Sequence, residues 1–281
     1  MRTEPNLKDA HGRQKTASEQ FSLREAKRSA MITLSSDFGS PYPAAMKGVV
    51  LQSSEARLVD VAHDFPRQDV RAAAFWLREV LPYFPPAVHL AVVDPGVGTD
   101  RAAVVVRAGK HAFVAPDNGV AIPAARRIDE DVEVFEISVD DPASSTFHGR
   151  DVFAPAAADV HERGVDTFHQ YPEYERTDGY ETVSFPDPDL AGGDVLGEVL
   201  VVDGFGNAVT NVPGKVLDGR FGGDIRVDGE PAPVAQSYAR VDAGQRLVTV
   251  GSHGNVELAV NRGRGDDAFD VRAGDEVALS W

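Results

Sequence analysis

The chain has 281 residues and a formal net charge of −16 at pH 7. It contains no Cys and no apolar run of about 18 residues, which excludes disulfide frameworks, cysteine-zinc sites, cysteine nucleophiles and membrane-spanning helices. The negative charge argues against nucleic-acid binding, because phosphates require a basic surface. The length is sufficient for two domains or one large one.

The charged residues are strongly biased in type. There are 6 Lys against 22 Arg, and 28 Asp against 16 Glu. Few Lys and many Asp suit a protein that stays soluble in concentrated salt, where screening weakens self-repulsion. This pattern favours a halophilic source, and an acidic protein from a GC-rich genome is the alternative.

Residues 1–30 are polar, mixed in charge and without periodicity. They lack the apolar h-region of a signal peptide, so we expect a cytoplasmic protein. We interpret this segment as a disordered N-terminal extension or as sequence upstream of the true start at Met31.

Between residues 31 and 164, short apolar strands alternate with helical segments. This alternation predicts an α/β domain built on a mostly parallel, covered sheet. Asp69 is expected to cap the N-terminus of the second helix, which ends near Leu81 before Pro82. The predicted strands are 32–34, 57–61, 87–93, 102–107, 111–115 and 132–137, and the predicted helices are about 44–53, 69–81 and 150–163.

Residues 165–194 are rich in Pro, Tyr and acidic side chains, and we interpret them as a linker. Residues 195–281 then form a separate domain in which the helical pattern stops. Short strands separated by Gly, Asp and Pro turns predict a small C-terminal all-β domain, either a sandwich or barrel-like. The predicted strands are 195–202, 208–212, 223–227, 246–251, 255–260 and 276–281.

Polar clusters follow the predicted strands of the first domain. In open parallel sheets, ligands bind beyond the carboxyl ends of the strands. One such cluster alone is an ordinary turn, because Asp and Gly are common turn residues, but four at one sheet edge indicate a site. The clusters are Asp37-Phe38-Gly39, His63-Asp64, Asp94-Pro95-Gly96-Val97-Gly98 and Asp117-Asn118-Gly119.

Three further segments carry candidate functional groups. His148 precedes a helix, where it either belongs to the helix start or acts as an acid, base or orienting group. The segments 203–207 and 251–257 are either hairpin turns or presenters of amide and hydroxyl groups to a polar ligand. There is no GxGxxG, P-loop, GxSxG or HExxH motif, and His63 has no partners at metal-ligand spacing. We expect His89 to be structural and His161 to face solvent.

Several motifs occur together in a characteristic order. They are Met-Ile-Thr-Leu-x-x-Asp-Phe-Gly at 31–39, Asp-Pro-Gly-Val-Gly-Thr-x-Arg at 94–101, Pro-Asp-Asn-Gly at 116–119, Ser-Thr-Phe-His-Gly-Arg-Asp at 145–151, Phe-Gly-Asn at 205–207 and Gly-Ser-His at 251–253. From Met31 to its end, the chain thereby resembles the S-adenosyl-L-methionine (SAM) hydroxide adenosyltransferases, the hydrolase branch of the fluorinase and chlorinase family.

This resemblance implies a reaction in which water or hydroxide attacks the ribose C5′ of SAM and gives adenosine and L-methionine. It implies that Asp94, Arg101 and His148 form the catalytic triad that holds the water. Either Asp94 or His148 can accept the proton, and Arg101 can orient the hydroxide or the carboxylate. Removal of the (R)-sulfonium epimer is a second hypothesis from the same resemblance.

The resemblance also implies the substrate-binding residues. Asp37 would accept hydrogen bonds from both ribose hydroxyls, because a carboxylate is a bidentate acceptor. Asn207 and the ring of Tyr238 would contact adenine, and Asp203 and Ser252 the amino acid part. The full predicted set is Asp37, Phe38, Asp203, Asn207, Tyr238, Ser252, Glu257 and Val260. The loop from Asp37 to Met46 is about two residues shorter than usual in the family, which affects contacts at residues 40–42.

The family resemblance implies a homotrimer with sites at subunit interfaces, no metal, no cofactor besides the substrate SAM, and no nucleic-acid or membrane partner. Two alternatives without catalytic activity are an adenosine- or SAM-binding protein and a trimeric scaffold with a vestigial site. A third alternative is a halide-using, chlorinase-like SAM adenosyltransferase. Asp94 opposes it, because a carboxylate repels an incoming halide.

Overall fold

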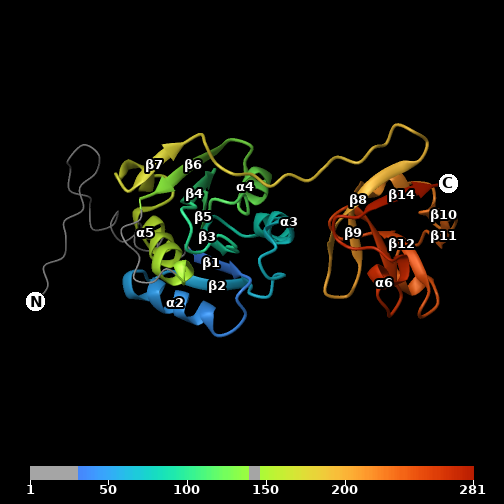
Figure 1. Cartoon of the computed structure of the whole chain (residues 1–281), viewed down its shortest axis with the longest axis horizontal. Coiled ribbons are helices and arrows are strands. Elements are labelled where there is room, and N and C mark those ends of the chain that lie inside the picture. The colour runs from blue at the N-terminus through green and yellow to red at the C-terminus, as the bar shows by residue number, and fades with distance from the viewer. Residues whose placement is uncertain (1–30, 139–145) are drawn as a thin grey trace, which may run out of the picture. The chain divides into compact units, whose positions relative to one another are not determined.

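A computed structural model describes residues 31–138 and 146–281 of the chain (Figure 1). The fold divides into two compact units, the first ending at Val183 and the second beginning at Ser184. The extension predicted for residues 1–30 lies outside the described residues. Among those residues, no helix is both long and apolar enough to cross a membrane.

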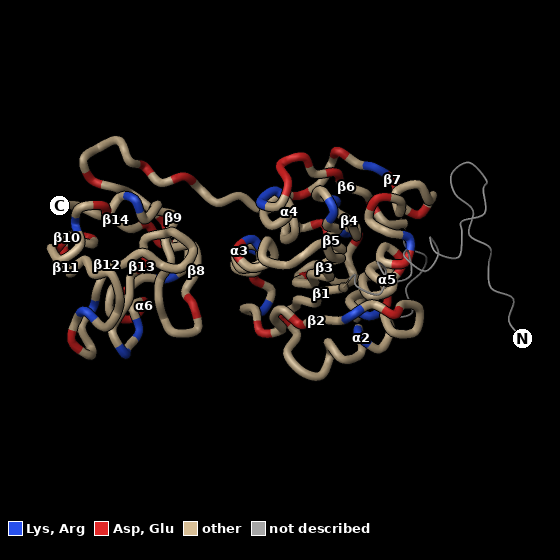
Figure 2. The backbone as a smooth tube through the Cα atoms, turned by 180° about the vertical axis from the view of Figure 1, so that it is seen from behind, with Lys and Arg blue, Asp and Glu red and all other residues tan. Residues whose placement is uncertain are grey.

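The first unit contains a seven-stranded sheet with the order β2-β1-β3-β5-β4-β6-β7. β2, β1, β3 and β5 run parallel, whereas β4, β6 and β7 join by antiparallel pairs. The central strands β1, β3 and β5 carry no Lys, Arg, Asp or Glu (Figure 2), as expected for strands covered on both faces. The strands are β1 (Met31–Ser36), β2 (Arg57–Ala62), β3 (Ala87–Val92), β4 (Ala103–Ala108), β5 (His111–Pro116), β6 (Val132–Ile137) and β7 (Tyr174–Thr177).

Among the described residues of this unit, four α-helices flank the sheet in two pairs. Helices α2 (Tyr42–Ser53) and α5 (Ala154–Arg163) pack together, and α3 (Val70–Val80) packs on α4 (Ile122–Ile128) (Figure 1). The α2–α5 pair covers a core that includes Ile32 and Leu90. Asp69 caps α3 as predicted, its carboxylate accepting the Ala72 N–H at 2.9 Å. A π-helical turn, Gly149–Phe153, leads into α5.

Strand β7 lies inside the stretch interpreted as a linker, and it pairs with β6. Its first residue, Tyr174, is buried, packs its ring against Phe168 at 5.0 Å, and donates a hydrogen bond to Asp159 at 2.7 Å. Side-chain contacts, which also include an ion pair of Arg176 with Glu133 on β6 at 2.8 Å, therefore hold a four-residue strand that has no periodic pattern of its own. The first unit consequently extends further along the chain than its local pattern indicates.

The second unit is a seven-stranded antiparallel sheet with the order β11-β10-β14-β8-β9-β13-β12. A bridge between Val234 and Val248 brings its two edges together, so the sheet is a nearly closed barrel and the predicted α/β plus all-β fold is confirmed. Helix α6 (Gly265–Phe269) and strand β11 were not predicted, and neither was helix α4 of the first unit. The strands are β8 (Val195–Val202), β9 (Ala208–Pro213), β10 (Asp224–Val227), β11 (Glu230–Pro233), β12 (Arg246–Val250), β13 (Asn255–Val260) and β14 (Glu276–Ser280).

Two histidines form a buried pair in the first unit. His89 on β3 shares hydrogen bonds with Thr33 at 2.8 Å and with His111 at 2.9 Å, and the two imidazole rings are stacked. Burial and the neighbouring His111 lower the pKa of His89 to about 3, and burial lowers the pKa of His111. His89 is thus a structural residue, as expected, and it is held neutral inside the fold.

This pair predicts acid sensitivity. The unfolded chain binds a proton at His89 below pH 6.5 and the folded chain does so only near pH 3, so stability falls as the pH drops between these values. The contribution from His89 amounts to about 3 kcal/mol between pH 7 and pH 4. Denaturant unfolding of wild type and His89→Gln at several pH values should show a shallower pH dependence in the variant. Equal slopes would contradict the assignment.

Candidate functional site

The loops that follow the parallel strands of the first unit meet at one edge of its sheet. Asp37 follows β1, Asp94 follows β3 by one residue, and Asp117 follows β5 directly. β1 and β5 both neighbour β3, so these carboxylates lie at the ends of adjacent parallel strands. Asp117 is used within the fold, since it accepts the Glu181 N–H at 2.9 Å.

Asp94 and Arg101 form a buried ion pair. Arg101 Nη2 lies 2.5 Å from Asp94 Oδ2, with the Asp94 side chain fully buried and the Arg101 side chain 12% exposed. Nη1 donates to the carbonyl of Ala102, and the guanidinium lies over the ring of Phe153 at 5.2 Å. Arg101 Nε is buried and has no partner among the described residues. The loop therefore holds a carboxylate and a donor group in fixed positions.

His148 immediately precedes the π-helical turn and is partly buried. Among the described residues, no hydrogen bond joins its imidazole to Asp94, to Arg101 or to another side chain. The adjacent Gly149 fits closely against other groups, since a Cβ there would lie 3.0 Å from Met46 Sδ and 3.1 Å from the ring of Phe38. This close packing places the His148 segment against the loop that carries Asp37.

Asp37 and Phe38 lie within this packed region. Asp37 Oδ2 accepts the Gln68 N–H at 2.7 Å, whereas Oδ1 has no partner among residues 31–138 and 146–281. The rings of Phe38, Tyr42 and Phe147 meet edge to face, with centroids 5.4–6.4 Å apart. The first unit thus gathers Asp37, Phe38 and the segment of His148 by direct contacts. Phe153, the last residue of the turn that follows His148, is the residue whose ring lies under the Arg101 guanidinium.

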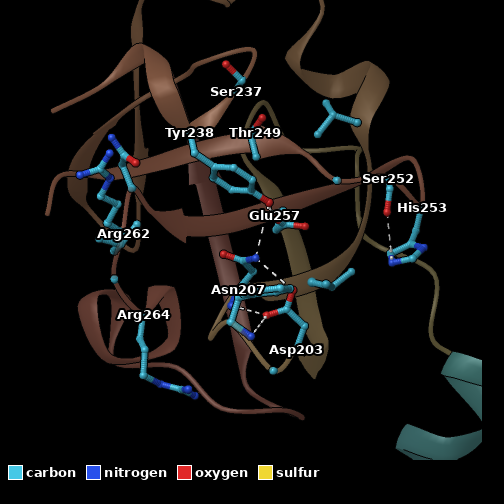
Figure 3. A pocket seen from close by; sticks show the side chains of 18 of the residues that line it. Asp203, Asn207, Ser237, Tyr238, Thr249, Ser252, His253, Glu257, Arg262 and Arg264 are labelled. Atoms are coloured by element: carbon cyan, nitrogen blue, oxygen red, sulfur yellow. Dashed lines mark hydrogen bonds between the residues drawn. The ribbon is translucent and has the colours of Figure 1, made fainter. Parts of the chain in front are cut away.

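The second unit contains a cavity of about 980 Å³ (Figure 3). Asp203 organises the turn at one wall: Oδ1 accepts the N–H groups of Phe205 and Asn207, each at 2.8 Å, and Oδ2 accepts from Asn207 Nδ2 at 3.0 Å. Asn207 Nδ2 also lies 3.5 Å from the Tyr238 hydroxyl. Because both amide hydrogens are directed to these groups, Asn207 offers its carbonyl oxygen as an acceptor to the cavity.

Tyr238 and Glu257 form the centre of this cavity (Figure 3). The Tyr238 hydroxyl donates to Glu257 Oε1 at 2.5 Å. Burial and the negative charge of Asp203 raise the pKa of Glu257, and burial together with the bond to Glu257 raises the pKa of Tyr238. Glycine at 251 makes room for this carboxyl group, since a Cβ there would lie 2.5 Å from Glu257 Oε2.

Ser252 and Val260 also line the cavity, Ser252 on the exposed turn between β12 and β13 and Val260 at the end of β13. All six residues predicted from the second unit therefore line one cavity. Thr249 and Arg262 line it too, and neither was predicted from the sequence. Thr249 lies opposite Glu257 in the β12–β13 register, so only the pairing of these strands identifies it.

Among the residues that the structure describes, no group of three His, Asp or Glu side chains is placed to hold a metal ion. The histidine of the cluster His63-Asp64 instead contacts Ser36 and Asp60. The polar groups at the candidate sites are carboxylates, amides, hydroxyls, guanidinium groups and imidazoles. Such groups suit a polar organic ligand that carries hydroxyl, amino and carboxylate groups.

Comparisons with known proteins agree with this chemistry. The family model of the SAM hydroxide adenosyltransferase N-terminal domain matches residues 32–170, and that of the C-terminal domain matches residues 197–278. A protein of Salinispora tropica named (R)-S-adenosyl-L-methionine hydrolase is 38% identical over 259 residues, covering 89% of this chain and 97% of the relative. A protein of Thermus thermophilus with the same name is 39% identical, covering 87% and 97%.

Solved structures show the same fold. An uncharacterized conserved protein from Thermotoga maritima superposes with a TM-score of 0.76 at 34% identity, covering 89% of this chain and 100% of that one. A conserved hypothetical protein from Thermus thermophilus gives a TM-score of 0.72 at 37% identity, covering 89% and 99%. The two family models match both domains of this chain in their order along the sequence. The chain therefore belongs to the SAM hydroxide adenosyltransferase family.

Proposed function

We propose that this protein hydrolyses SAM to adenosine and L-methionine. The observation that carries the proposal is the buried Asp94–Arg101 pair, in a chain about 38% identical to named (R)-S-adenosyl-L-methionine hydrolases over nearly their whole length. A carboxylate at this position disfavours a halide nucleophile, because like charges repel. It suits water, which needs an acceptor for its proton.

The reaction forms a C5′–O bond and breaks the C5′–S bond, and the electron pair leaves with sulfur as a neutral thioether. The leaving group is good, so the protein must position and activate the water. In the proposed mechanism, Asp94 and Arg101 orient this water, and either Asp94 or His148 removes its proton. Both oxygens of Asp94 already accept hydrogen bonds, from Arg101 Nη2 and the Gly96 N–H, so we infer that His148 takes the proton.

The substrate-binding roles follow from the groups that each loop presents. The free oxygen of Asp37 suits the ribose diol. The acceptor oxygen of Asn207 suits the exocyclic amino group of adenine, and the ring of Tyr238 suits its face. Asp203 would attract the ammonium group of the methionine part and Ser252 would bind its carboxylate. Phe38, Glu257 and Val260 would complete the walls.

A homotrimer with its sites at subunit interfaces, preference for the (R)-sulfonium epimer, a halophilic source and a cytoplasmic location are further parts of the proposal. Phe205, which lines the cavity of the second unit, is 81% exposed, and a large exposed aromatic side chain suits coverage by another subunit. Sedimentation at several salt concentrations tests the trimer.

Hydrolysis in ¹⁸O-water tests the reaction itself. Mixed epimers of SAM incubated with the protein in about molar KCl, where a salt-adapted acidic protein is screened, should yield adenosine with ¹⁸O at the 5′ position. The surviving epimer reports the stereochemical preference. 5′-Chloro-5′-deoxyadenosine would assign the protein to halide transfer. Tight SAM binding without any turnover would leave a binding protein.

A further inference from the structure

A hydrogen-bonded chain of four polar side chains lies next to the Asp37 loop and consists of Ser36, His63, Asp60 and Lys47. Ser36 Oγ is 2.8 Å from His63 Nδ1, His63 Nε2 is 2.9 Å from Asp60 Oδ1, and Lys47 Nζ is 2.6 Å from Asp60 Oδ2. The chain runs from the fully buried end of β1, through β2 and its following loop, to helix α2. The proposed reaction uses none of these four groups.

The order of donors along this chain can be assigned. An ionised carboxylate only accepts hydrogen bonds, so His63 Nε2 carries the hydrogen directed at Asp60. In neutral His63, Nδ1 is then an acceptor, and the Ser36 hydroxyl donates to it. Burial raises the pKa of Asp60, but hydrogen bonds from Lys47 and His63 outweigh burial and leave the pKa below its ordinary value. Asp60 therefore stays ionised and fixes the orientation of the imidazole.

The loop that begins at His63 makes three hydrogen bonds to the segment 36–39, which carries Asp37. The His63 side chain bonds Ser36, the Gln68 N–H bonds Asp37 Oδ2 at 2.7 Å, and the His63 carbonyl accepts the Gly39 N–H at 2.8 Å. Gln68 adopts a φ of +62°, a left-handed conformation that is uncommon for a non-glycine residue. The residue in this conformation is the one whose N–H bonds the Asp37 carboxylate.

The same chain reaches the segment of His148. Lys47 follows Met46 on α2, and Met46 Sδ lies at the position facing Gly149, next to His148. One hydrogen-bonded chain is thus connected to both the Asp37 loop and the packing partner of the His148 segment. Replacement of the His63 imidazole would remove the bond to Ser36, next to Asp37, and would leave the Lys47–Asp60 bond in place.

We propose that His63 is a positioning residue that fixes the Asp37 carboxylate for the ribose diol, through its bonds to Ser36 and Asp60. The inference rests on the proposed function, in which Asp37 binds this diol. His63 does not touch the substrate. It holds the 63–68 loop in the conformation that leaves one oxygen of Asp37 bound to Gln68 and the other open to a ligand.

A double-mutant cycle tests whether His63 acts through Asp37. His63→Ala should lower kcat/KM for SAM about 10-fold in the wild-type background, and less than about 2-fold in the Asp37→Ala background, because the carboxylate that it positions is already gone. Equal losses in both backgrounds would overturn the proposal, since a general structural role would reduce activity independently of Asp37.

Ligand binding provides a second readout that does not require turnover. His63→Ala should weaken adenosine binding about 10-fold in calorimetry and leave binding of 2′,3′-dideoxyadenosine unchanged, because the latter lacks the diol. Weaker binding of both ligands, or unchanged binding of both, would overturn the proposal. If wild type binds adenosine but releases none from SAM, the proposed function fails while this test of His63 still stands.

The chain offers a matched control and two informative replacements. His161 lies in a similar cluster, 3.0 Å from Ser54 Oγ, and is buried on the C-terminal part of α5, whereas His63 is partly buried. His161→Ala should lower the melting temperature without changing discrimination between the two nucleosides. His63→Asn, whose amide can replace Nδ1 toward Ser36, should retain more diol discrimination than His63→Gln, whose amide reaches toward Asp60. The opposite order would contradict the role of the Ser36 bond.

Discussion

Replacing Asp94 by Asn is expected to lower kcat for adenosine release about 10²- to 10³-fold, the effect typical of a lost general base or charge-stabilising group. The change also leaves the Arg101 guanidinium, 12% exposed, without its carboxylate. An uncompensated buried charge costs about 3 kcal/mol, so the melting temperature should fall as well. Assays of adenosine release and thermal unfolding of the same preparation separate the loss of kcat from the loss of stability.

Glu79 provides the control for this experiment. It is a buried carboxylate of the same unit, 2.7 Å from Arg78 Nε, on helix α3. Glu79→Gln should lower the melting temperature in a similar way and leave kcat within about twofold, since an ion pair outside the site acts on stability alone. If both variants lose activity in proportion to their loss of stability, Asp94 has a structural role only.

Replacing Asp203 by Ala is expected to raise KM for SAM at least about 10-fold. The carboxylate accepts three hydrogen bonds from its own turn, and without it the Asn207 amide can rotate away from the cavity. Two backbone N–H groups also lose their acceptor, which should destabilise the fold by about 1–3 kcal/mol. Steady-state kinetics and denaturant unfolding measure the two consequences.

Asp275 makes a comparable local bond in the same unit, because its carboxylate accepts the Arg272 N–H at 2.7 Å. It does not line the cavity. Asp275→Ala should therefore reduce stability modestly and leave KM unchanged. If Asp203→Ala and Asp275→Ala have the same KM, Asp203 is not a substrate-binding residue.

Elements of the fold with local signals could be predicted from sequence. Helix α3 is an example, because Asp69 is a capping residue and the apolar spacing that follows is helical. Strand β7 could not be predicted, since its stability comes from the contacts of Tyr174 with Asp159 and Phe168. Closure of the barrel depends on the bridge between Val234 and Val248, which is fixed only when the whole sheet has formed.

Some features of the candidate site could likewise be predicted from the sequence, and others could not. The rule for parallel sheet edges is enough to place Asp37 and Asp94 together from the sequence. The contacts of His63 with Ser36 and Asp60 could not be predicted in this way, because they depend on which strands are neighbours. The prediction that His161 faces solvent is wrong, since the helix turns it toward Ser54 and buries it.

The π-helical turn before α5 has a consequence for how this site can change. There the Ala154 N–H bonds the Gly149 carbonyl, one residue further back than in an α-helix, so the turn acts as a single inserted residue. Each residue of a helix rotates the next side chain by about 100°, and an inserted one resets that rotation. His148 is therefore freed from the helical spacing that Ala157 and Val160 must keep in the core. Substitutions on one side of the turn can alter ligand contacts while the helix beyond it retains its packing.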